Sequence, residues 1–399
     1  MNFSLMSTQF IALTITVVIV LSLFKGIARQ MVFLVANVVF VWGLLLGTKG
    51  TLSTVASCLL GYIIVCLILW RPRWCFLPGI AVYVLLFVYM QNYDFLGHIL
   101  PEGMLTRILR TVGLSFLFFK VLHVMIEARS GMLNKLEFLT YLNYCLNFTT
   151  FMMGPIQRFQ DYYEQWYKQK QAIPLRFESH LDAVLRILAG LLKVYVLAYW
   201  IESLALRHDT DLLKLSLLGW FTKVYAFYFF LYFNFSGYCD VVIGIGSLIG
   251  VRPPENFNKP FIAKNISDFW LRQHRSLTLW LTDYVFSPLY KTFLETRRLS
   301  SYPLLSANVA LLLTMVVSGL WHGTTLIFLL FGITHGIFLV VYRTWDTLLK
   351  KWLGRKALLK LRMRWEVKAA SIFLTFNATA FAFVFFRLDT GQILKLLKA

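Results

Sequence analysis

The chain has 399 residues, of which 58% are hydrophobic and only 15% are charged, and its mean hydropathy is +0.66. This composition excludes an ordinary soluble domain. The net charge of +20 does not indicate nucleic-acid binding, because the basic residues lie in short connections between apolar runs and form no separate polar domain. We therefore expect an integral membrane protein and no nucleic-acid partner.

Apolar runs recur from one end of the chain to the other. With roughly 17–25 residues for each membrane crossing, they predict about ten or eleven transmembrane helices. No soluble domain of useful size interrupts them, so we expect one polytopic all-α membrane domain over residues 1–399. The runs are Phe10–Phe24, Met31–Gly47, Val55–Trp70, Phe76–Met90, Leu114–Ile126, Phe138–Met153, Ala183–Tyr199, Ser216–Phe235, Pro303–Leu320, Thr325–Tyr342 and Ala369–Phe386.

The connections between the runs carry the positive charge. The most basic one is "KKWLGRKALLKLRMRW" at Lys350–Trp365. Such loops face the cytoplasm in proteins of the bacterial inner membrane. We therefore expect the protein to lie in that membrane, with its basic loops on the cytoplasmic side. The polar connection Gly154–His180 mixes Tyr, Trp and Lys, and we expect it to lie at the membrane interface. The five cysteines show no metal-ligand or redox spacing and are expected to be buried thiols; they are Cys58, Cys66, Cys75, Cys145 and Cys239.

The segment "SDFWLRQHRSLTLWLTDYVFSPLY" places a histidine among aromatic residues. Asn265 is a plausible N-cap with Asp268 three residues later, and the pattern predicts an unbroken amphipathic helix over Phe269–Ser287. His274 would share the apolar face with Trp270 and point toward protein or lipid. A structural histidine in the core is an equally good interpretation at this point. The opposite, polar face would carry Arg272, Arg275, Ser276, Thr282 and Asp283.

A second histidine, His322 in "SGLWHG", lies at a break between two apolar runs. Gly319 and Gly323 flank it and permit a close backbone approach or an interrupted helix. Irregular backbone at membrane depth occurs where it is buried in protein or lines a cavity. An imidazole at such a break therefore indicates a functional site.

A third histidine, His335 in "GITHG", is expected to be structural. It lies 13 residues after His322, which is about 20 Å along a continuous helix, too far for both rings to reach one reacting atom. Gly332 and Gly336 form a pair of small residues that allows a neighbouring helix to approach. We expect His335 to form a hydrogen bond between helices there.

These segments together resemble the bacterial branch of the membrane-bound O-acyltransferase family. The resemblance rests on "FNFSGYCD", the histidine segment Ser267–Tyr290, "SGLWHG" and "GITHG", with "MMGPIQRFQDY" upstream. It covers roughly residues 154–389, which would form the acyltransferase core, with residues 1–153 as N-terminal helices. The branch includes alginate and peptidoglycan O-acetylation proteins and teichoic acid D-alanyl transferases.

The resemblance implies an enzyme that moves an acyl group, acetyl in the first instance, from a cytoplasmic thioester to an extracytoplasmic hydroxyl. The donor would be acetyl-CoA or an acyl carrier protein, and the acceptor an envelope polysaccharide or a partner transferase. His322 aligns with the catalytic histidine and His274 with a polar residue facing a central tunnel. No bound cofactor or metal is expected, because a thioester is already activated. Further tunnel residues would be Trp321, Asn258, Trp270, Ser236, Asp240 and Arg158.

Three alternatives stay open at this stage. D-alanyl transfer to teichoic acid is the alternative within the same class. A transporter would also explain intramembrane histidines and broken helices, but it predicts paired interruptions in two related halves, and the first half shows none. A purely structural partner in an envelope complex gives no reason for a histidine in a break between glycines.

Overall fold

The computed structural model describes residues 7–45, 48–91, 93, 113–168, 177–206, 216–297 and 299–386. Within these ranges the chain forms helices and connections and no strand, which confirms the predicted all-α fold. The chain divides into two compact units. Unit 1 comprises Met1–Lys193 and Ser236–Pro254, and unit 2 comprises Val194–Phe235 and Glu255–Ala399. The single membrane domain that the sequence predicts stays a prediction.

Among the described residues, eight helices are long and apolar enough to cross a membrane. The protein is therefore a multi-pass membrane protein. The sequence predicted about ten or eleven crossings on the basis of length alone, and the difference lies in three apolar runs that fold as shorter helices. Helix α1 (Thr8–Leu23) has 16 residues and α5 (Leu114–Ser130) has 17. The run at 138–153 is split into α6 (Phe138–Leu146) and α7 (Phe148–Phe151).

Asparagine side chains divide that run. The Asn147 side-chain oxygen accepts hydrogen bonds from the backbone N–H and the hydroxyl of Thr149, at 3.1 and 2.9 Å, and so caps α7. The backbone N–H of Phe148 donates to Asn37, 2.9 Å away, and the Asn37 amide donates to Asn143. The backbone N–H groups of Phe148 and Thr149 at the break are thus paired inside unit 1.

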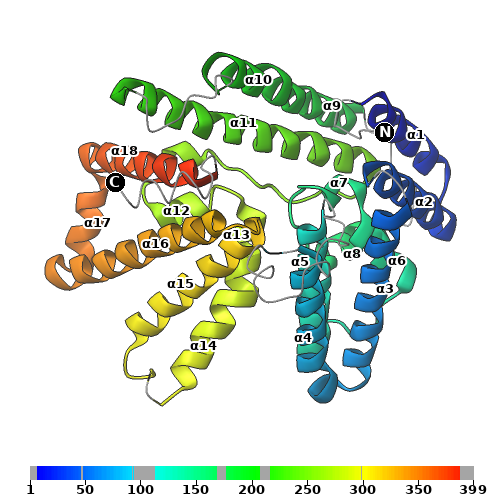
Figure 1. The fold of residues 1–399 in the computed structure, drawn as a ribbon, viewed down its shortest axis with the longest axis horizontal. Helices are drawn as coiled ribbons and strands as arrows, with labels where there is room; N and C mark the ends of the chain where they lie inside the picture. The colour runs from blue at the N-terminus through cyan, green and yellow to red at the C-terminus, as the bar shows by residue number, and fades with distance from the viewer. Residues whose placement is uncertain are drawn as a thin grey trace, which may run out of the picture. The chain divides into compact units, whose positions relative to one another are not determined.

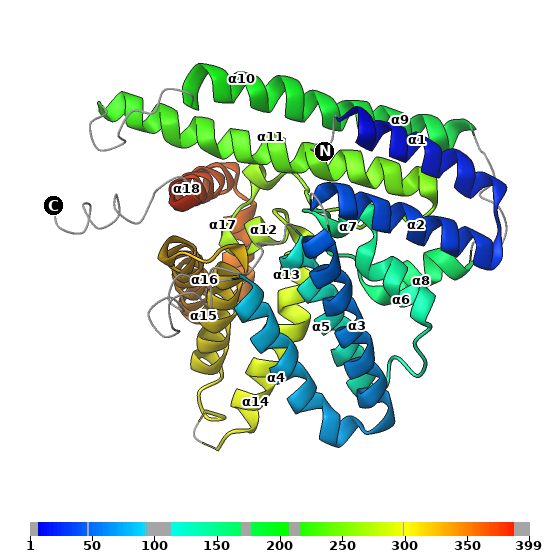
Figure 2. The ribbon, with the colours of Figure 1, turned by 45° about the vertical axis from the view of Figure 1, so that its right-hand side comes forward.

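The remaining helices of unit 1 pack around this network. Helices α3, α4 and α5 lie side by side in both views (Figures 1 and 2). The remaining bounds are α2 (Gly26–Leu44), α3 (Thr48–Trp70), α4 (Pro72–Gln91), α8 (Phe159–Lys168) and α9 (Phe177–Leu192).

Free thiols are distributed over unit 1. Cys58, Cys145 and Cys239 are buried, as predicted, whereas Cys66 and Cys75 are partly exposed. None of the five forms a disulfide bond.

Unit 2 holds the predicted histidine segment. A π-helical turn, η6 (Thr282–Phe286), joins α13 to α14, so these three elements follow one another without a loop. Helix α11 (Leu217–Ile249) belongs to unit 2 as far as Phe235 and to unit 1 from Ser236. The other elements are η2 (Lys193–Ala198), α10 (Tyr199–Ile201), η3 (Glu202–Leu206), η5 (Pro260–Ile262), α12 (Ile266–Trp270), α13 (Arg275–Leu281), α14 (Ser287–Glu295), α15 (Pro303–His322), α16 (Leu326–Leu353), α17 (Arg355–Met363), α18 (Trp365–Phe383) and η7 (Val384–Phe386).

Helices α15 and α16 form a tight hairpin (Figure 2). Glycines make the close approach possible. A β-carbon on Gly332 would lie 2.3 Å from the carbonyl oxygen of Met315, and one on Gly319 would lie 2.4 Å from that of Phe328. The predicted close contact through small residues is therefore confirmed, and it fixes the end of α15 against the start of α16.

Candidate active site

The histidine segment does not form one continuous helix. Helix α12 ends at Trp270, α13 begins at Arg275, and His274 caps α13 with φ 49° and ψ 49°, the left-handed conformation. The prediction of an unbroken helix over Phe269–Ser287 is therefore wrong. A left-handed non-glycine residue costs roughly 1–2 kcal/mol, so neighbouring contacts must hold the turn.

Asn256 supplies those contacts from the extended segment before α12. Its side-chain oxygen accepts hydrogen bonds from the backbone N–H and the hydroxyl of Ser276, at 3.1 and 2.8 Å, and its carbonyl accepts from the Arg275 N–H at 2.9 Å. Two residues on, the Asn258 N–H donates to the Arg272 carbonyl at 2.9 Å. Ser276, predicted on the exposed face, is buried because it binds Asn256.

The predicted cap at the start of α12 is confirmed. The Asn265 side chain accepts a hydrogen bond from the Asp268 N–H at 2.8 Å, and an Asp268 carboxylate oxygen accepts from the Lys264 N–H at 3.0 Å. Both ends of the broken segment are thus held by short polar side chains, and the turn between them aims His274 inward.

The left-handed turn buries the His274 ring, which is 5% exposed. Its ring centroid lies 4.9 Å from that of Phe235, 5.8 Å from that of Trp321 and 6.4 Å from that of His322. His274 Nδ1 has no hydrogen-bond partner among the described residues. Burial, and secondarily the neighbouring imidazole of His322, lowers the pKa of His274 to about 3, so the ring is neutral at physiological pH.

His322 lies at the end of α15, where the helix breaks at Gly323. A β-carbon on Gly323 would lie 2.1 Å from the ring of Phe328, so the break requires glycine. The imidazole is enclosed by aromatic rings on three sides: Trp321 at 4.8 Å, Phe331 at 5.6 Å and Phe386 at 5.4 Å between centroids.

His322 differs from the other two histidines in its access. It is partly exposed, whereas the rings of His274 and His335 are buried. No described residue forms a hydrogen bond with the His322 side chain, so its ring nitrogens are available to a substrate hydroxyl. The structure thus brings together the two histidines that the sequence placed 48 residues apart, and only one of them can be reached.

His335 is fully buried but is not the predicted link between helices. Neither ring nitrogen has a hydrogen-bond partner among the described residues. Its ring packs against Phe331 at 4.5 Å, Trp270 at 5.1 Å and Phe383 at 5.7 Å between centroids. The hydrogen-bonding prediction is therefore wrong. Phe331 contacts both His335 and His322, so an aromatic ring stands between these imidazoles.

The other predicted tunnel residues of unit 2 divide into two groups. Trp321 and Trp270 are buried and contact the histidines directly. Asn258 has an exposed side chain, and only its backbone takes part in holding the turn. Asn256, which the sequence did not single out, has that structural role, and no periodic pattern could have found it because its partner Ser276 lies 20 residues away.

Ser236, Asp240 and Arg158 belong to unit 1. Ser236 is buried and its hydroxyl has no hydrogen-bond partner among the described residues. Arg158 lies just before α8 and is partly exposed. Their predicted place on the tunnel stays a prediction.

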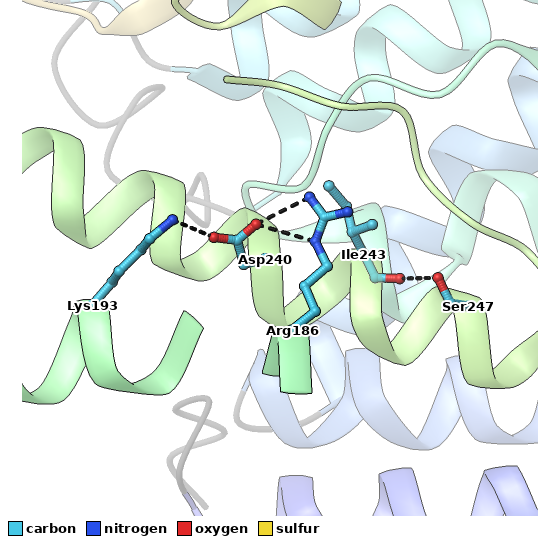
Figure 3. Close-up of polar contacts among 5 residues, drawn as sticks. All are labelled: Arg186, Lys193, Asp240, Ile243 and Ser247. Atoms are coloured by element: carbon cyan, nitrogen blue, oxygen red, sulfur yellow. Dashed lines mark hydrogen bonds and ion pairs between the residues drawn. The ribbon is translucent and has the colours of Figure 1, made fainter. Parts of the chain in front are cut away.

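Asp240 of α11 lies at the centre of an ion-pair cluster with Arg186 of α9 and Lys193, the first residue of η2 (Figure 3). One carboxylate oxygen accepts hydrogen bonds from the Arg186 guanidinium at 3.0 and 3.1 Å, and the other accepts from the Lys193 ammonium. Both cations thus pair with a carboxylate within helices that span the membrane, where an unpaired charge is unfavourable. Asp240 therefore pairs α11 with α9 electrostatically.

No group of three or more His, Cys, Asp or Glu side chains in the described ranges could hold a metal ion. The chemistry that this site offers is that of a neutral, accessible imidazole in an aromatic enclosure, which is suited to accepting a proton.

The model of the membrane-bound O-acyltransferase family matches residues 125–375, which include His274, His322 and His335. The chain belongs to the membrane-bound O-acyltransferase family. It is 34% identical over 292 residues to a teichoic acid D-alanyltransferase from Streptococcus thermophilus, which is 70% of this chain and 68% of that relative. This O-acyltransferase also resembles a probable alginate O-acetylase from Pseudomonas aeruginosa, at 31% identity over 60% of this chain and 44% of the relative. A peptidoglycan O-acetyltransferase from Helicobacter pylori is 32% identical over 66% of this chain and 46% of the relative.

Proposed function

We propose that this membrane O-acyltransferase moves an acyl group from a cytoplasmic thioester to a hydroxyl on the outer side of the bacterial cytoplasmic membrane. The donor would be acetyl-CoA or an acyl carrier protein, and the acceptor an envelope polysaccharide or a partner transferase. The observation that carries the proposal is His322: among the three imidazoles that the structure describes in unit 2 it is the one that is partly exposed, and its ring nitrogens bind no described residue.

The reaction follows from that position. Neutral His322 accepts the proton of the acceptor hydroxyl while the hydroxyl oxygen attacks the thioester carbonyl carbon. The carbon–oxygen bond forms, the carbon–sulfur bond breaks, and the imidazolium returns the proton to the departing thiolate. Atoms and charge balance without a metal or a bound cofactor, because the thioester supplies the activation.

His274 has a supporting role in this proposal. Its centroid lies 6.4 Å from that of His322, and its low pKa keeps it neutral, so it adds no repulsive charge when His322 becomes protonated. Its left-handed backbone and the bonds from Asn256 fix the ring in place. We therefore assign it to positioning the acceptor or the acyl group beside His322.

Two acyl groups fit the relatives. Acetyl transfer agrees with the names of the alginate and peptidoglycan relatives, which match less than half of their own length. D-alanyl transfer is the second candidate, because the relatives from Streptococcus thermophilus and Bacillus subtilis match over 68% and 73% of their length. Mass spectrometry of envelope polymers from cells with and without the protein distinguishes the two by the mass gained for each modified unit.

The test of His322 is a paired measurement on His322→Gln. Glutamine preserves the polarity and approximate volume of the side chain but cannot act as a base. A general base contributes about 10²–10⁴-fold, or roughly 3–5 kcal/mol of transition-state stabilisation. We expect thermal stability and donor affinity close to those of the parent, and transfer reduced by at least about 100-fold.

His180→Gln is the matched control, since it makes the same substitution at a partly exposed histidine that belongs to unit 1, and it should keep its transfer activity. A stable His322→Gln protein that binds donor and transfers at more than about a tenth of the parental rate would remove His322 from the role of base. His274 would then be the first candidate for that role.

A further inference from the structure

A cleft of about 540 Å³ is lined by residues of α16, α17 and α18, all in unit 2. Figure 1 shows these three helices following one another along the chain. It is separate from the ring contacts of His322 described above. Its wall is mainly apolar: Val341, Trp345 and Leu349 come from α16, Leu361 from α17 and Leu374 from α18. The side chains of Trp345 and Leu374 are 51% and 67% exposed, so the apolar wall is accessible from outside the protein.

Cations lie along the same cleft. Lys264, Arg362 and Lys368 are among its lining residues, and no carboxylate is among them in the part of the chain that the structure describes. Arg362 pairs with Asp346, which also binds Lys350. The ammonium groups of Lys264 and Lys368 are exposed and form no ion pair with a described residue. The cleft therefore combines an apolar wall with two unneutralised positive charges.

Helix α17 indicates the depth of this cleft in the membrane. Its nine residues include the basic residues Arg355, Lys356, Lys360 and Arg362. Leu358 is buried beneath it, whereas other apolar side chains of the helix remain exposed. Basic and apolar residues on one short helix are typical of a helix that lies in the headgroup layer. The exposed residues Trp352 and Trp365, on either side of α17, are the type that is enriched at that level.

We propose that this cleft binds one anionic phospholipid. Its phosphate would lie between Lys264 and Lys368, and one acyl chain would follow the apolar wall of α16 and α18. The two lysines match the phosphate, the apolar wall matches an acyl chain, and the interfacial features of α17 match the level of the headgroup. Basic pockets between helices on the cytoplasmic side are suited to anionic headgroups because that leaflet carries the anionic lipids.

A bound lipid would also contact residues that support the active site. Phe338 lines the cleft, and its ring centroid lies 5.9 Å from that of His335. Ile266, another lining residue, begins α12, which ends just before the turn of His274. Occupancy should therefore raise the thermal stability of this region. The proposal does not depend on the acyl transfer assigned to His322.

The experiment uses the full-length protein in neutral detergent, with phosphatidylglycerol or phosphatidylcholine added, and native mass spectrometry to count bound lipids. The test variant is Lys264→Gln/Lys368→Gln. Lys356→Gln/Lys360→Gln is the control: both of its residues are exposed on α17 but do not line the cleft, and it removes the same charge. Each basic residue near an anionic headgroup contributes about fivefold in affinity, so the test variant should bind phosphatidylglycerol about 30-fold more weakly.

The expected result is retention of phosphatidylglycerol over phosphatidylcholine by the parent and by the control, and loss of that preference in the test variant. Equal retention of the two lipids by the parent, or equal losses in both variants, would overturn the proposal. Inorganic phosphate alone should neither stabilise the protein nor displace the lipid, and full competition by phosphate would show an anion site without a lipid. Ser371→Trp, which fills the cleft and leaves every charge in place, should lower retention of phosphatidylglycerol, and undiminished retention would place the lipid elsewhere.

Discussion

Replacing Asn256 by alanine should loosen the turn that aims His274. The side chain is 1% exposed, and its oxygen accepts two hydrogen bonds from Ser276, at 3.1 and 2.8 Å. Alanine removes the side-chain oxygen that accepts both bonds, and each lost bond of a buried donor costs about 1–3 kcal/mol. The backbone bond to Arg275 persists, and we expect a loss of about 2–6 kcal/mol in the free energy of unfolding, with reduced transfer.

The measurement is thermal unfolding of purified variants in one detergent, beside their transfer rates. Asn258→Ala is the matched control, because the Asn258 side chain is exposed and its hydrogen bonds come from the backbone. Ser276→Ala removes one donor and should cost less than Asn256→Ala, and the double variant should cost less than the sum of the two. Equal stability and equal transfer in Asn256→Ala and Asn258→Ala would refute the role of Asn256 in holding the turn.

Three further results are expected. Gly332→Ala places a β-carbon 2.3 Å from the Met315 carbonyl oxygen and should destabilise by more than about 2 kcal/mol, whereas Gly336→Ala, 2.8 Å from a movable leucine side chain, should cost less than about 1 kcal/mol. His335→Leu removes two unpaired buried nitrogens and should leave stability unchanged or raise it by about 1 kcal/mol, with transfer retained. Acidification should destabilise the parent more than His274→Gln, because unfolded His274 binds a proton below about pH 6.5 whereas the folded residue does so only near 3.

Each of these three predictions can be contradicted by one result. Equal melting temperatures for the two glycine variants would mean that α15 and α16 are less tightly packed than described. A folded but inactive His335→Leu protein would give that imidazole a chemical role. For His274, the stabilising contribution of the neutral ring is fully present above pH 6.5 and is lost as the pH falls toward 3. Parallel stability curves for the parent and His274→Gln between pH 7 and 5 would therefore contradict its low pKa.

Much of the fold could be predicted from hydropathy alone, because each spanning helix requires a long apolar run. All eight spanning helices arise from predicted runs. The run at 138–153 does not form one spanning helix, because Asn147 caps a new helix within it. The hydrogen bond between Asn147 and Thr149 outweighs the continuous apolar character of the run. Hydropathy indicates only whether a segment prefers an apolar environment. It does not show that a side-chain oxygen can compete with the helical carbonyl groups for a backbone N–H.

The sequence predicted the helix break at His322 but not the turn at His274. Glycine on both sides of His322 correctly indicated a break, because the absence of a β-carbon is a local property. The left-handed turn at His274 had no such signal. Residues other than glycine seldom adopt that conformation, and the hydrogen bonds that hold it come from Asn256, which is distant in sequence. Helical periodicity therefore placed Ser276 on the wrong side.

The π-helical turn at Thr282–Phe286 determines how the protein accommodates the insertion or deletion of one residue between α13 and α14. A π-turn accommodates one residue more than an α-helix over the same path, so α14 is rotated by about 100° relative to a continuation of α13. Deleting one residue there restores regular α-helix over the same path and leaves the same side of α14 toward its surroundings. The turn of His274 lies upstream and keeps its own bonds. A change of one residue at this turn can thus be absorbed locally, while the surface that α14 presents and the imidazole pair stay as they are.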